Sequence, residues 1–381
     1  LPNKRFKKIR ESVKMRSGDL TSVNTGNMIN HRLFKHYNID TGKDLQISAR
    51  CPKPFDTLLI DSSGSCYACE CTAWLPQSIG NIQLTPLQDI IDSSTHATLQ
   101  QSINDGTYRY CNSNLCPYIK LYKNTQNANW SFGPDHQHTM THSHIKHLRL
   151  AIDNSCNLKC PSCRTSRIML TRGSQFRARR RMADRVIDYM NAATQPLTVH
   201  VGSDGDPFAS LIYRYFLRHA PSKDNIELSL MTNGLLMKQM HPRVESQFQR
   251  LRKLEISIDG ATKHTYEKLR LGGNFHKLMS NLHWLNTIDH RKNFEVHLHF
   301  VVQPDNYREM IDMIKLREDV GADKLFFNPI QNWNTFGNWS QMNIMHSEHP
   351  DHEPLQKMIK QILRRPDYNR SVLLHGFDNL F

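Results

Sequence analysis

Apolar and polar positions change their pattern near residue 145. Beyond it, short apolar runs alternate with longer amphipathic stretches whose apolar positions recur at helical spacing. The apolar runs predict six strands, at 145–152, 197–201, 226–231, 254–258, 294–302 and 324–327. The stretches between them predict helices near 177–193, 210–219, 235–249, 275–287 and 308–320. Regular alternation of strands and helices predicts an α/β fold with a parallel sheet.

The N-terminal part has shorter elements and more turns. Residues 55–61 predict a strand, Ser62-Ser63-Gly64-Ser65 signals a turn, and 86–93 predict a helix. Further elements are expected at 28–37 and 355–363 (helices) and from 45 to 48 (the start of a strand). We expect five parts: a basic arm and helix (1–44), a cysteine-rich module (45–120), a polar linker (121–144), the strand–helix domain (145–335) and a segment that caps its open end (336–381).

Composition limits the class of protein. The chain has 381 residues, 38% of them hydrophobic, which suits one large or two modest domains. No apolar run is long enough to span a membrane, and no signal peptide is visible, although the chain starts at Leu1. Nine cysteines without a secretory signal indicate metal ligation rather than disulfides. We therefore expect a cytoplasmic, oxygen-sensitive protein with no membrane partner.

Three cysteines form a compact loop directly after the first predicted strand of the strand–helix domain. Cys156, Cys160 and Cys163 have the spacing C-x3-C-x2-C. A [4Fe-4S] cluster usually takes four thiolates, so a loop with three leaves one iron open to a chelating ligand. The carboxyl end of a parallel strand is also where α/β folds place their chemistry. A zinc site and three unrelated thiols remain as alternatives, although zinc sites usually add a second knuckle or a histidine pair.

The other six cysteines lie in the N-terminal module: Cys51, Cys66, Cys69, Cys71, Cys111 and Cys116. The first two bracket a predicted hairpin, and the last two return to it from further along the chain. Thiols gathered at hairpin ends predict a second metal site, either an iron–sulfur cluster or zinc. The linker histidines His136, His138, His142 and His144 follow no ligand pattern, so we expect them to be solvated or hydrogen-bonded.

The cysteine loop and the segments after it resemble the radical S-adenosylmethionine (radical SAM) family over about 145–335. The resemblance implies a partial (β/α)6 TIM-like barrel. It also implies that Cys156, Cys160 and Cys163 hold a catalytic [4Fe-4S] cluster whose open iron chelates S-adenosylmethionine. Reductive cleavage in that family yields a 5′-deoxyadenosyl radical, which abstracts a substrate hydrogen. The implied partner is a one-electron reductant protein of the flavodoxin or ferredoxin type.

The same resemblance implies cofactor contacts after each strand. Gly202-Ser203-Asp204-Gly205-Asp206 occupies the place of the family's GGE motif, which holds the amino group of the methionine part, with Asp206 where a glutamate is usual. Thr232-Asn233-Gly234 is a common family ending of the third strand. Ser257 is expected at the ribose or methionine part, Arg270 at the carboxylate, and Asp259 at ribose or substrate. The expected cofactor contacts are Gly202, Ser203, Gly205, Asp206, Ser257, Asp259, Arg270, Gln303 and Asn328. Ser162 departs from the family, which usually has an aromatic residue before the third cysteine.

The N-terminal module resembles the SPASM/twitch module of many radical SAM enzymes, which carries an auxiliary [4Fe-4S] cluster. Cys51-Pro52, the turn before Cys66, Gly80-Asn81-Ile82 and the final cysteine pair carry the resemblance. Here the module precedes the radical domain, whereas it usually follows. Six cysteines exceed the four that one cluster needs, so two are spare or belong to a second, incomplete cluster. The auxiliary cluster is expected to bind substrate or to accept an electron.

Charge bears on the substrate. The formal net charge is +14, which favours polyanions such as nucleic acids, phosphorylated metabolites or anionic membranes. Arginines crowd the segment after the cysteine loop, and we expect Arg177, Arg179, Arg180 and Arg181 to contact substrate phosphate, unless they form a solvated helix face. We therefore expect a modified nucleotide, free or within DNA or RNA. The alternatives are a peptide- or sugar-modifying SPASM enzyme and, in another class, a non-catalytic iron–sulfur protein that binds nucleic acid.

Overall fold

The computed structural model describes residues 47, 50–120, 144–377 and 380. The predicted basic arm and helix, the strand expected at 45–48 (apart from Ile47) and linker residues 121–143 lie outside the described residues. Within them, no helix is both long enough and apolar enough to cross a membrane.

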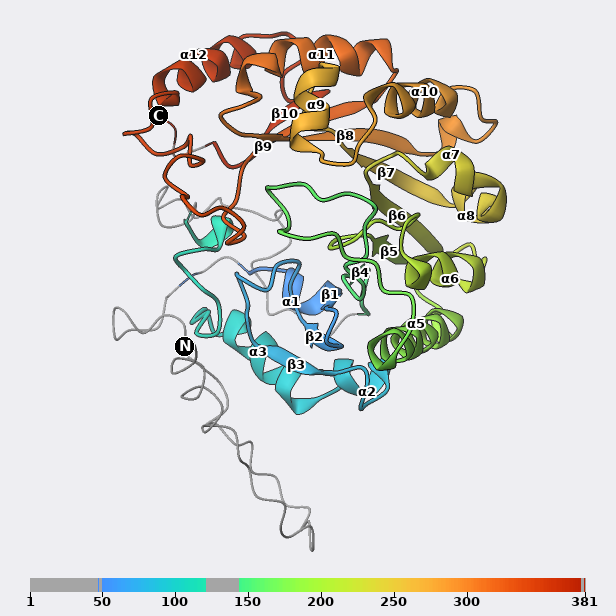
Figure 1. Ribbon diagram of the computed structural model, residues 1–381. Coiled ribbons are helices and arrows are strands. Elements are labelled where there is room, and N and C mark those ends of the chain that lie inside the picture. The colour runs from blue at the N-terminus through green and yellow to red at the C-terminus, as the bar shows by residue number, and fades with distance from the viewer. Residues whose placement is uncertain (1–46, 48–49, 121–143, 378–379, 381) are drawn as a thin grey trace, which may run out of the picture. The chain divides into compact units, whose positions relative to one another are not determined.

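The strands belong to one ten-stranded sheet with the order β10-β9-β8-β7-β6-β5-β4-β1-β2-β3. Six strands follow the chain as parallel neighbours: β4 (His147–Leu150), β5 (Leu197–Val201), β6 (Ile226–Thr232), β7 (Leu251–Ser257), β8 (Glu295–Val302) and β9 (Lys324–Pro329). Figure 1 shows these strands along an open arc with helices on its outer side. The predicted partial (β/α)6 barrel is confirmed.

The helices between these strands are α5 (Ser174–Ala192), α6 (Leu211–His219), α10 (Phe275–Leu285) and α11 (Met310–Asp319), close to their predicted ranges. The helix predicted at 235–249 is broken into α7 (Met237–Met240), η4 (His241–Arg243) and α8 (Glu245–Phe248). Pro242 explains the break, because its ring lacks an N–H and clashes with a continuing helix. An unpredicted helix, α9 (Lys263–Leu269), begins at Thr262, whose side chain accepts a hydrogen bond from the Thr265 N–H.

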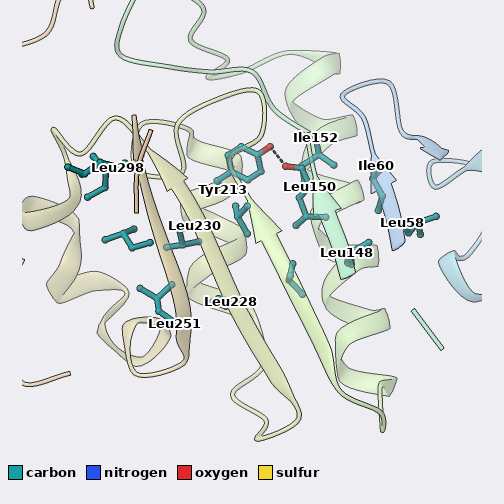
Figure 2. Packing of buried hydrophobic residues seen from close by; sticks show 14 of the residues in the cluster. Leu58, Ile60, Leu148, Leu150, Ile152, Tyr213, Leu228, Leu230, Leu251 and Leu298 are labelled. Carbon is teal, nitrogen blue, oxygen red and sulfur yellow. Dashed lines mark hydrogen bonds between the residues drawn. The ribbon is translucent and has the colours of Figure 1, made fainter. Parts of the chain in front are cut away.

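In barrel strands such as β5, alternation separates an apolar outer face from a polar inner face. In β5, Leu197, Val199 and Val201 are buried, whereas Thr198 and His200 between them are half-buried. Figure 2 shows the apolar side chains of neighbouring strands in contact, with the Tyr213 hydroxyl of α6 donating to the Leu150 carbonyl at 3.0 Å. The inner face is therefore left for polar side chains.

The cysteine-rich module shares the sheet of the barrel. It comprises α1 (Lys53–Asp56), β1 (Thr57–Ile60), β2 (Ser65–Tyr67), β3 (Ser78–Asn81), α2 (Leu87–Ile91) and α3 (Ser94–Asn104). The strand β1 pairs in parallel with β4, so Leu58 and Ile60 lie beside Leu148 and Leu150 in one core (Figure 2). The strand predicted from residue 55 begins later, because Pro52 and Pro54 start α1.

The C-terminal segment also extends the sheet. After α12 (His352–Leu363), the strand β10 (Val372–Leu374) pairs in parallel with β9. Asp351, just before α12, accepts hydrogen bonds from Tyr307 (2.8 Å) and Arg308 (2.7 Å) of the short helix η6 (Tyr307–Glu309). The segment 336–381, expected to cap the barrel, therefore adds β10 as an edge strand next to β9.

Candidate active site and second cysteine cluster

The loop with Cys156, Cys160 and Cys163 leaves the carboxyl end of β4 and is held by backbone hydrogen bonds. The Cys156 N–H donates to Ile168 at 2.9 Å, and the Lys159 N–H donates to Leu271 at 3.0 Å. The Cys163 N–H donates back to the carbonyl of Cys160 at 3.0 Å. Both ends of the loop, and the turn after α9, therefore fix where the three thiols lie.

Asp153 anchors the start of this loop from a fully buried position. Its carboxylate accepts hydrogen bonds from Arg179 of α5 at 2.6 Å and from Ser210, the N-cap of α6, at 2.5 Å. Arg179 also donates to the Asn154 side chain at 2.9 Å. A buried charge is tolerated when it is paired and hydrogen-bonded, as this one is. The first two helices of the barrel thus hold the cysteine loop.

Each sulfur of the loop accepts a hydrogen bond. Cys156 Sγ accepts from the Leu158 N–H at 3.4 Å and from Asn233 Nδ2 at 3.7 Å. Arg270 donates to Cys160 Sγ at 3.9 Å, and Arg164 donates to Cys163 Sγ at 3.5 Å. Such donors stabilise thiolate, the form that ligates metal. Burial, with a smaller contribution from Asp206, raises the pKa of Cys156 to about 11, so ligation has to release a proton.

The turn from Gly202 to Asp206 packs directly against the cysteine loop. A Cβ atom on Gly205 would lie 2.5 Å from the Asp153 carbonyl oxygen and 2.7 Å from that of Ser155. Gly202 has φ +100°, in the region that favours glycine. The Asp206 N–H donates to the Ser155 carbonyl at 2.9 Å. The close approach that these two glycines allow is therefore an approach to the cysteine loop.

The Asp206 side chain, expected to receive the cofactor's ammonium, is already hydrogen-bonded within the protein. Oδ1 accepts from the Phe208 and Ala209 N–H groups, at 3.0 and 2.9 Å. Oδ2 accepts from the Thr232 hydroxyl at 2.7 Å and from the Asn233 N–H at 2.9 Å. Asp206 is buried and joins the end of β6 to the turn after β5. Ser203, which is exposed, makes no such contact.

Arg270 and Asp259 form an ion pair beneath the cysteine loop. Arg270 Nε lies 2.7 Å from Asp259 Oδ2, and the Val301 N–H donates to Asp259 Oδ1 at 2.9 Å. Burial lowers the pKa of Arg270, but Asp259 and Cys160 outweigh it and raise that pKa above the ordinary value. The guanidinium therefore stays charged next to the thiols, where it can also face an anionic group.

Gln303 comes two residues after Val301, whose N–H donates to Asp259. It is buried, and among the described residues its Nε2 has no hydrogen-bond partner. An unpartnered buried amide is costly unless a ligand satisfies it. Ser257 ends β7 and Asn328 lies in β9, both half-buried at the carboxyl ends of their strands. The three expected contacts therefore lie on the same edge of the sheet as the cysteine loop, and the donor set fits a cluster with a bound cofactor.

The four arginines do not form one free face. Arg179 is paired with Asp153, and Arg180 lies over the ring of Tyr215 and 3.7 Å from Asp184. Arg177 and Arg181 are exposed. The phosphate contacts expected of the four arginines stay a prediction, and α5 turns Arg179 and Arg180 towards the cysteine loop and α6. Sequence spacing places residues around a helix but does not reveal which neighbour each one meets.

The module gathers four of its six cysteines. Cys51, Cys69, Cys111 and Cys116 line one pocket, together with Trp74, Tyr108 and Tyr118. Burial raises the pKa of all four thiols, and for Cys69 it does so to about 12. Cys66 does not line this pocket and donates to the Gly64 carbonyl at 3.7 Å. Cys71 does not line it either. The donor set of the pocket fits the four thiolates of one [4Fe-4S] cluster.

The described side chains do not have the geometry needed to bind a single metal ion. Within the described ranges, no three or more His, Cys, Asp or Glu side chains converge closely enough to hold one metal ion. The irons of a cubane occupy separate corners, so each thiolate approaches its own iron and the thiols stay apart. His144 of the linker is exposed, and the other linker histidines lie outside the described residues.

Two family models match the chain. The model of the radical SAM superfamily matches residues 152–317, and that of an iron–sulfur cluster-binding domain named SPASM matches residues 51–117. Residues 152–317 form a radical SAM domain. The predicted order, with the SPASM domain before the radical SAM domain, is confirmed. The family match supports a [4Fe-4S] cluster with S-adenosylmethionine at the first site and an auxiliary cluster in the module.

Curated relatives align over about half of this radical SAM protein. It is 24% identical over 200 residues to GTP 3′,8-cyclase of Limosilactobacillus fermentum, covering 51% of this chain and 57% of the relative. It is 26% identical over 193 residues to GTP 3′,8-cyclase of Lactiplantibacillus plantarum, covering 49% of this chain and 55% of the relative. The chain thus spans little more than half the length of these relatives.

The chain is also similar, at low TM-scores, to two solved structures. SuiB of Streptococcus suis bound to precursor peptide SuiA has a TM-score of 0.44 and 11% identity, with 75% of this chain and 55% of that chain covered. Native anSMEcpe with bound AdoMet has a TM-score of 0.36 and 22% identity, with 49% of this chain and 52% of that chain covered.

Proposed function

We propose that this protein reductively cleaves S-adenosylmethionine and uses the resulting 5′-deoxyadenosyl radical to abstract a hydrogen atom from a phosphate-bearing nucleotide. One observation carries the radical chemistry: three thiols at the end of β4 each accept a hydrogen bond, beside a buried ion pair and an unpartnered amide. When bound, the cluster would supply the electron that breaks the carbon–sulfur bond of S-adenosylmethionine.

The chain's own residues would position the reactants. Cys156, Cys160 and Cys163 would ligate the cluster, and Arg270 would hold negative charge next to it. Gln303 would donate to the cofactor through its free Nε2. Ser257 and Asn328 would contact the nucleoside part, since both lie near the carboxyl ends of their strands. Asp206 would shape the loop, because its four hydrogen bonds join the turn after β5 to the end of β6.

The pocket of the module supports an electron-accepting auxiliary cluster. Cys51, Cys69, Cys111 and Cys116 supply as many thiolates as a cubane has irons. With all four irons ligated by protein, none is left to bind substrate, which favours electron acceptance over coordination. An acceptor role implies a net oxidation or a new bond in the product. The electron that starts each turnover would come from a one-electron reductant protein of the flavodoxin or ferredoxin type, in the cytoplasm, where thiols stay reduced.

Two observations support a nucleotide substrate. The two aligned relatives are named for a reaction of GTP, and the net charge of +14 favours anionic partners. Arg177 and Arg181 are exposed on α5, and their charge would attract an anionic substrate. A nucleotide within DNA or RNA would use the same contacts, so the experiment includes both forms.

The test is 5′-deoxyadenosine production by anaerobically reconstituted protein with dithionite, in the presence of nucleoside triphosphates, DNA, RNA or no addition. We expect product that rises with one nucleotide form, and its loss in Cys163→Ala. Cys66→Ser is the matched control and should retain turnover. Product that is indifferent to every nucleotide form would overturn the substrate class. Product that persists in Cys163→Ala would overturn the radical chemistry.

A further inference from the structure

A large polar cavity opens at the end of the barrel opposite the cysteine loop. Its volume is about 920 Å³, and its wall includes inward-facing His147, Thr198, Lys253 and Lys324 near the amino ends of their strands. A volume of this size suits a small ligand. Since interiors of complete barrels are usually packed with branched apolar side chains, an open polar interior requires an explanation.

The cavity reaches deep into the barrel. His200 and Ser229 line it, and His200 lies only two positions before Gly202 in the chain. Because alternate residues of a strand face inward, His200 is the last inward-facing residue of β5, which ends at Val201. The cavity thus reaches the last inward position before the turn that packs on the cysteine loop.

The wall of this cavity is rich in cations. Five of its residues are lysine or arginine (Arg252, Lys253, Arg291, Lys292 and Lys324), against two acids, Glu295 and Asp323. Ion pairs engage three of the cations: Lys253 with Glu255 at 2.8 Å, Arg291 with Asp323 at 2.9 Å and Lys324 with Glu295 at 3.0 Å. Arg252 has only a distant, exposed partner at 3.6 Å, and Lys292 has no ion pair within the described part of the chain. Positive charge is therefore in excess at the mouth.

The deep end also carries unbalanced positive charge. Arg149 does not line the cavity itself, but it pairs in register with His200, which does, and its buried Nε has no hydrogen-bond partner among the described residues. Burial first, and then the charges of Arg149 and Lys253, lower the pKa of His200 to about 3. The nearest acid, Glu255, is already within 2.8 Å of both Lys253 and His299. A neutral imidazole beside an incompletely satisfied guanidinium suits an oxyanion.

We propose that this cavity binds the phosphate groups of a small nucleotide, with Arg252 and Lys292 at its mouth and with the charge of Arg149, the strand neighbour of His200, acting on its deep end. The choice of a nucleotide rests on the proposed function, whereas the anion site stands on the cavity and its charges. A ligand held here would extend from the far end of the barrel towards the cysteine loop. Its size excludes a duplex, so free nucleotides are favoured over nucleic acid.

The test is calorimetric titration of the full-length, cluster-loaded protein with pyrophosphate, a nucleoside triphosphate and the unphosphorylated nucleoside at fixed salt. We expect Arg149→Gln to weaken pyrophosphate binding by about tenfold and Arg252→Gln with Lys292→Gln to weaken it severalfold. Lys315→Gln, which removes an exposed cation of α11, is the matched control and should bind as the parent does. Equal affinity in Arg149→Gln and the parent, or nucleoside binding as tight as that of the triphosphate, overturns the site.

A second readout covers variants that misfold. The His200 ring proton, assigned by its loss in His200→Gln, should move on pyrophosphate addition, and the pKa of His200 should rise as the anion offsets Arg149 and Lys253. An unmoved resonance at saturating pyrophosphate contradicts the site. Because neither readout needs radical chemistry, absence of 5′-deoxyadenosine together with intact pyrophosphate binding would reject the proposed function and leave the anion site standing.

Discussion

Residues of one type differ in surroundings, and the cysteines of the module show this most clearly. Cys69 and Cys66 lie three positions apart, and both are buried. Only Cys69 lines the pocket with Cys51, Cys111 and Cys116, whereas Cys66 donates to the Gly64 carbonyl from β2. The direction of each side chain, rather than its position in the sequence, therefore decides whether the thiol lines the pocket.

We expect Cys69→Ser to lose the auxiliary cluster and Cys66→Ser to keep it. Iron per chain should fall from about eight to about four in Cys69→Ser, because each [4Fe-4S] cluster holds four irons. Cys71→Ser should resemble Cys66→Ser. Iron analysis and the electron paramagnetic resonance of the reduced protein measure the outcome. Equal iron loss in Cys66→Ser and Cys69→Ser would show that the pocket does not select the ligands.

The depressed pKa of His200 makes stability depend on pH. The folded protein keeps this imidazole neutral down to about pH 3, whereas the unfolded chain takes up a proton near pH 6.5. Since the unfolded state binds more protons between these values, stability falls as pH falls below about 6.5. One group contributes at most about 1.4 kcal/mol per pH unit.

Urea unfolding at pH 7.5 and 5.0 tests this effect. The free energy of unfolding should fall less with pH in His200→Gln than in the parent protein. His264→Gln, which removes an exposed histidine of α9, should behave as the parent does. An unchanged pH dependence in His200→Gln would mean that the imidazole is hydrated in the folded protein.

The sequence predicts the chemistry of single residues better than their contacts. The spacing of Cys156, Cys160 and Cys163 identifies a cluster loop because ligand spacing is local. It does not reveal that Asp153 pairs with Arg179, since that contact depends on how α5 packs. Nor does it reveal that Asp206 is fully hydrogen-bonded, because its donors Thr232 and Asn233 come from another strand.

At the scale of elements, the cysteine loop is held between two turns and two helices. The turn of Gly202 to Asp206 supports it on one side, and the turn after α9 supports it through Leu271. The sequence predicted the strands well because their apolar alternation is strong. It missed α9 and the break at Pro242, where short elements carry little periodic signal.

Gly205→Ala should displace the cysteine loop. The new methyl group would meet backbone oxygens at 2.5 and 2.7 Å, and backbone cannot yield as a side chain can. We expect a destabilisation of about 1–3 kcal/mol from overpacking and weaker cluster loading at the three-cysteine site. Gly337→Ala is the control, because no atom lies within 4 Å of its Cβ position. Iron content and thermal unfolding report the difference, and normal loading in Gly205→Ala would contradict the packing.

Arg179→Gln and Arg181→Gln compare the stability contributed by the buried and the exposed side of α5. Arg179→Gln leaves the Asp153 carboxylate buried without its ion pair, which costs about 3–5 kcal/mol. Arg181→Gln changes an exposed residue and should alter stability by less than about 0.5 kcal/mol. Chemical unfolding of the two variants measures this contrast. Similar stabilities would show that the Asp153 pair does not hold the loop.

At the scale of the whole molecule, the module and the barrel are joined through one sheet. The β1–β4 pairing continues the parallel order, and Arg185 of α5 donates to the Ile82 carbonyl of the module. Composition and cysteine spacing separate these regions in the sequence, since both are local properties. The pairing between them is long-range and carries no local signal, so the sequence gives no sign of it.

Because the module and the barrel share one core, we expect them to unfold together. Leu58→Ala empties a fully buried site in β1 and should cost about 2–5 kcal/mol. Faster amide hydrogen exchange should then appear in β4 as well as in β1. Leu84→Ala, at a module leucine that is 83% exposed, is the control. Loss of protection confined to the module would show that the two regions unfold independently.

The β1–β4 pairing also has a consequence for synthesis. The strand β1 leaves the ribosome about 90 residues before β4, a delay of roughly 5–20 s at ordinary elongation rates. During that time its edge has no parallel neighbour, and Leu58 and Ile60 lack half of their core. Unpaired apolar edges invite association with other chains. The module can therefore complete its core only after β4 has been synthesised. Until then its apolar edge is open to chaperones.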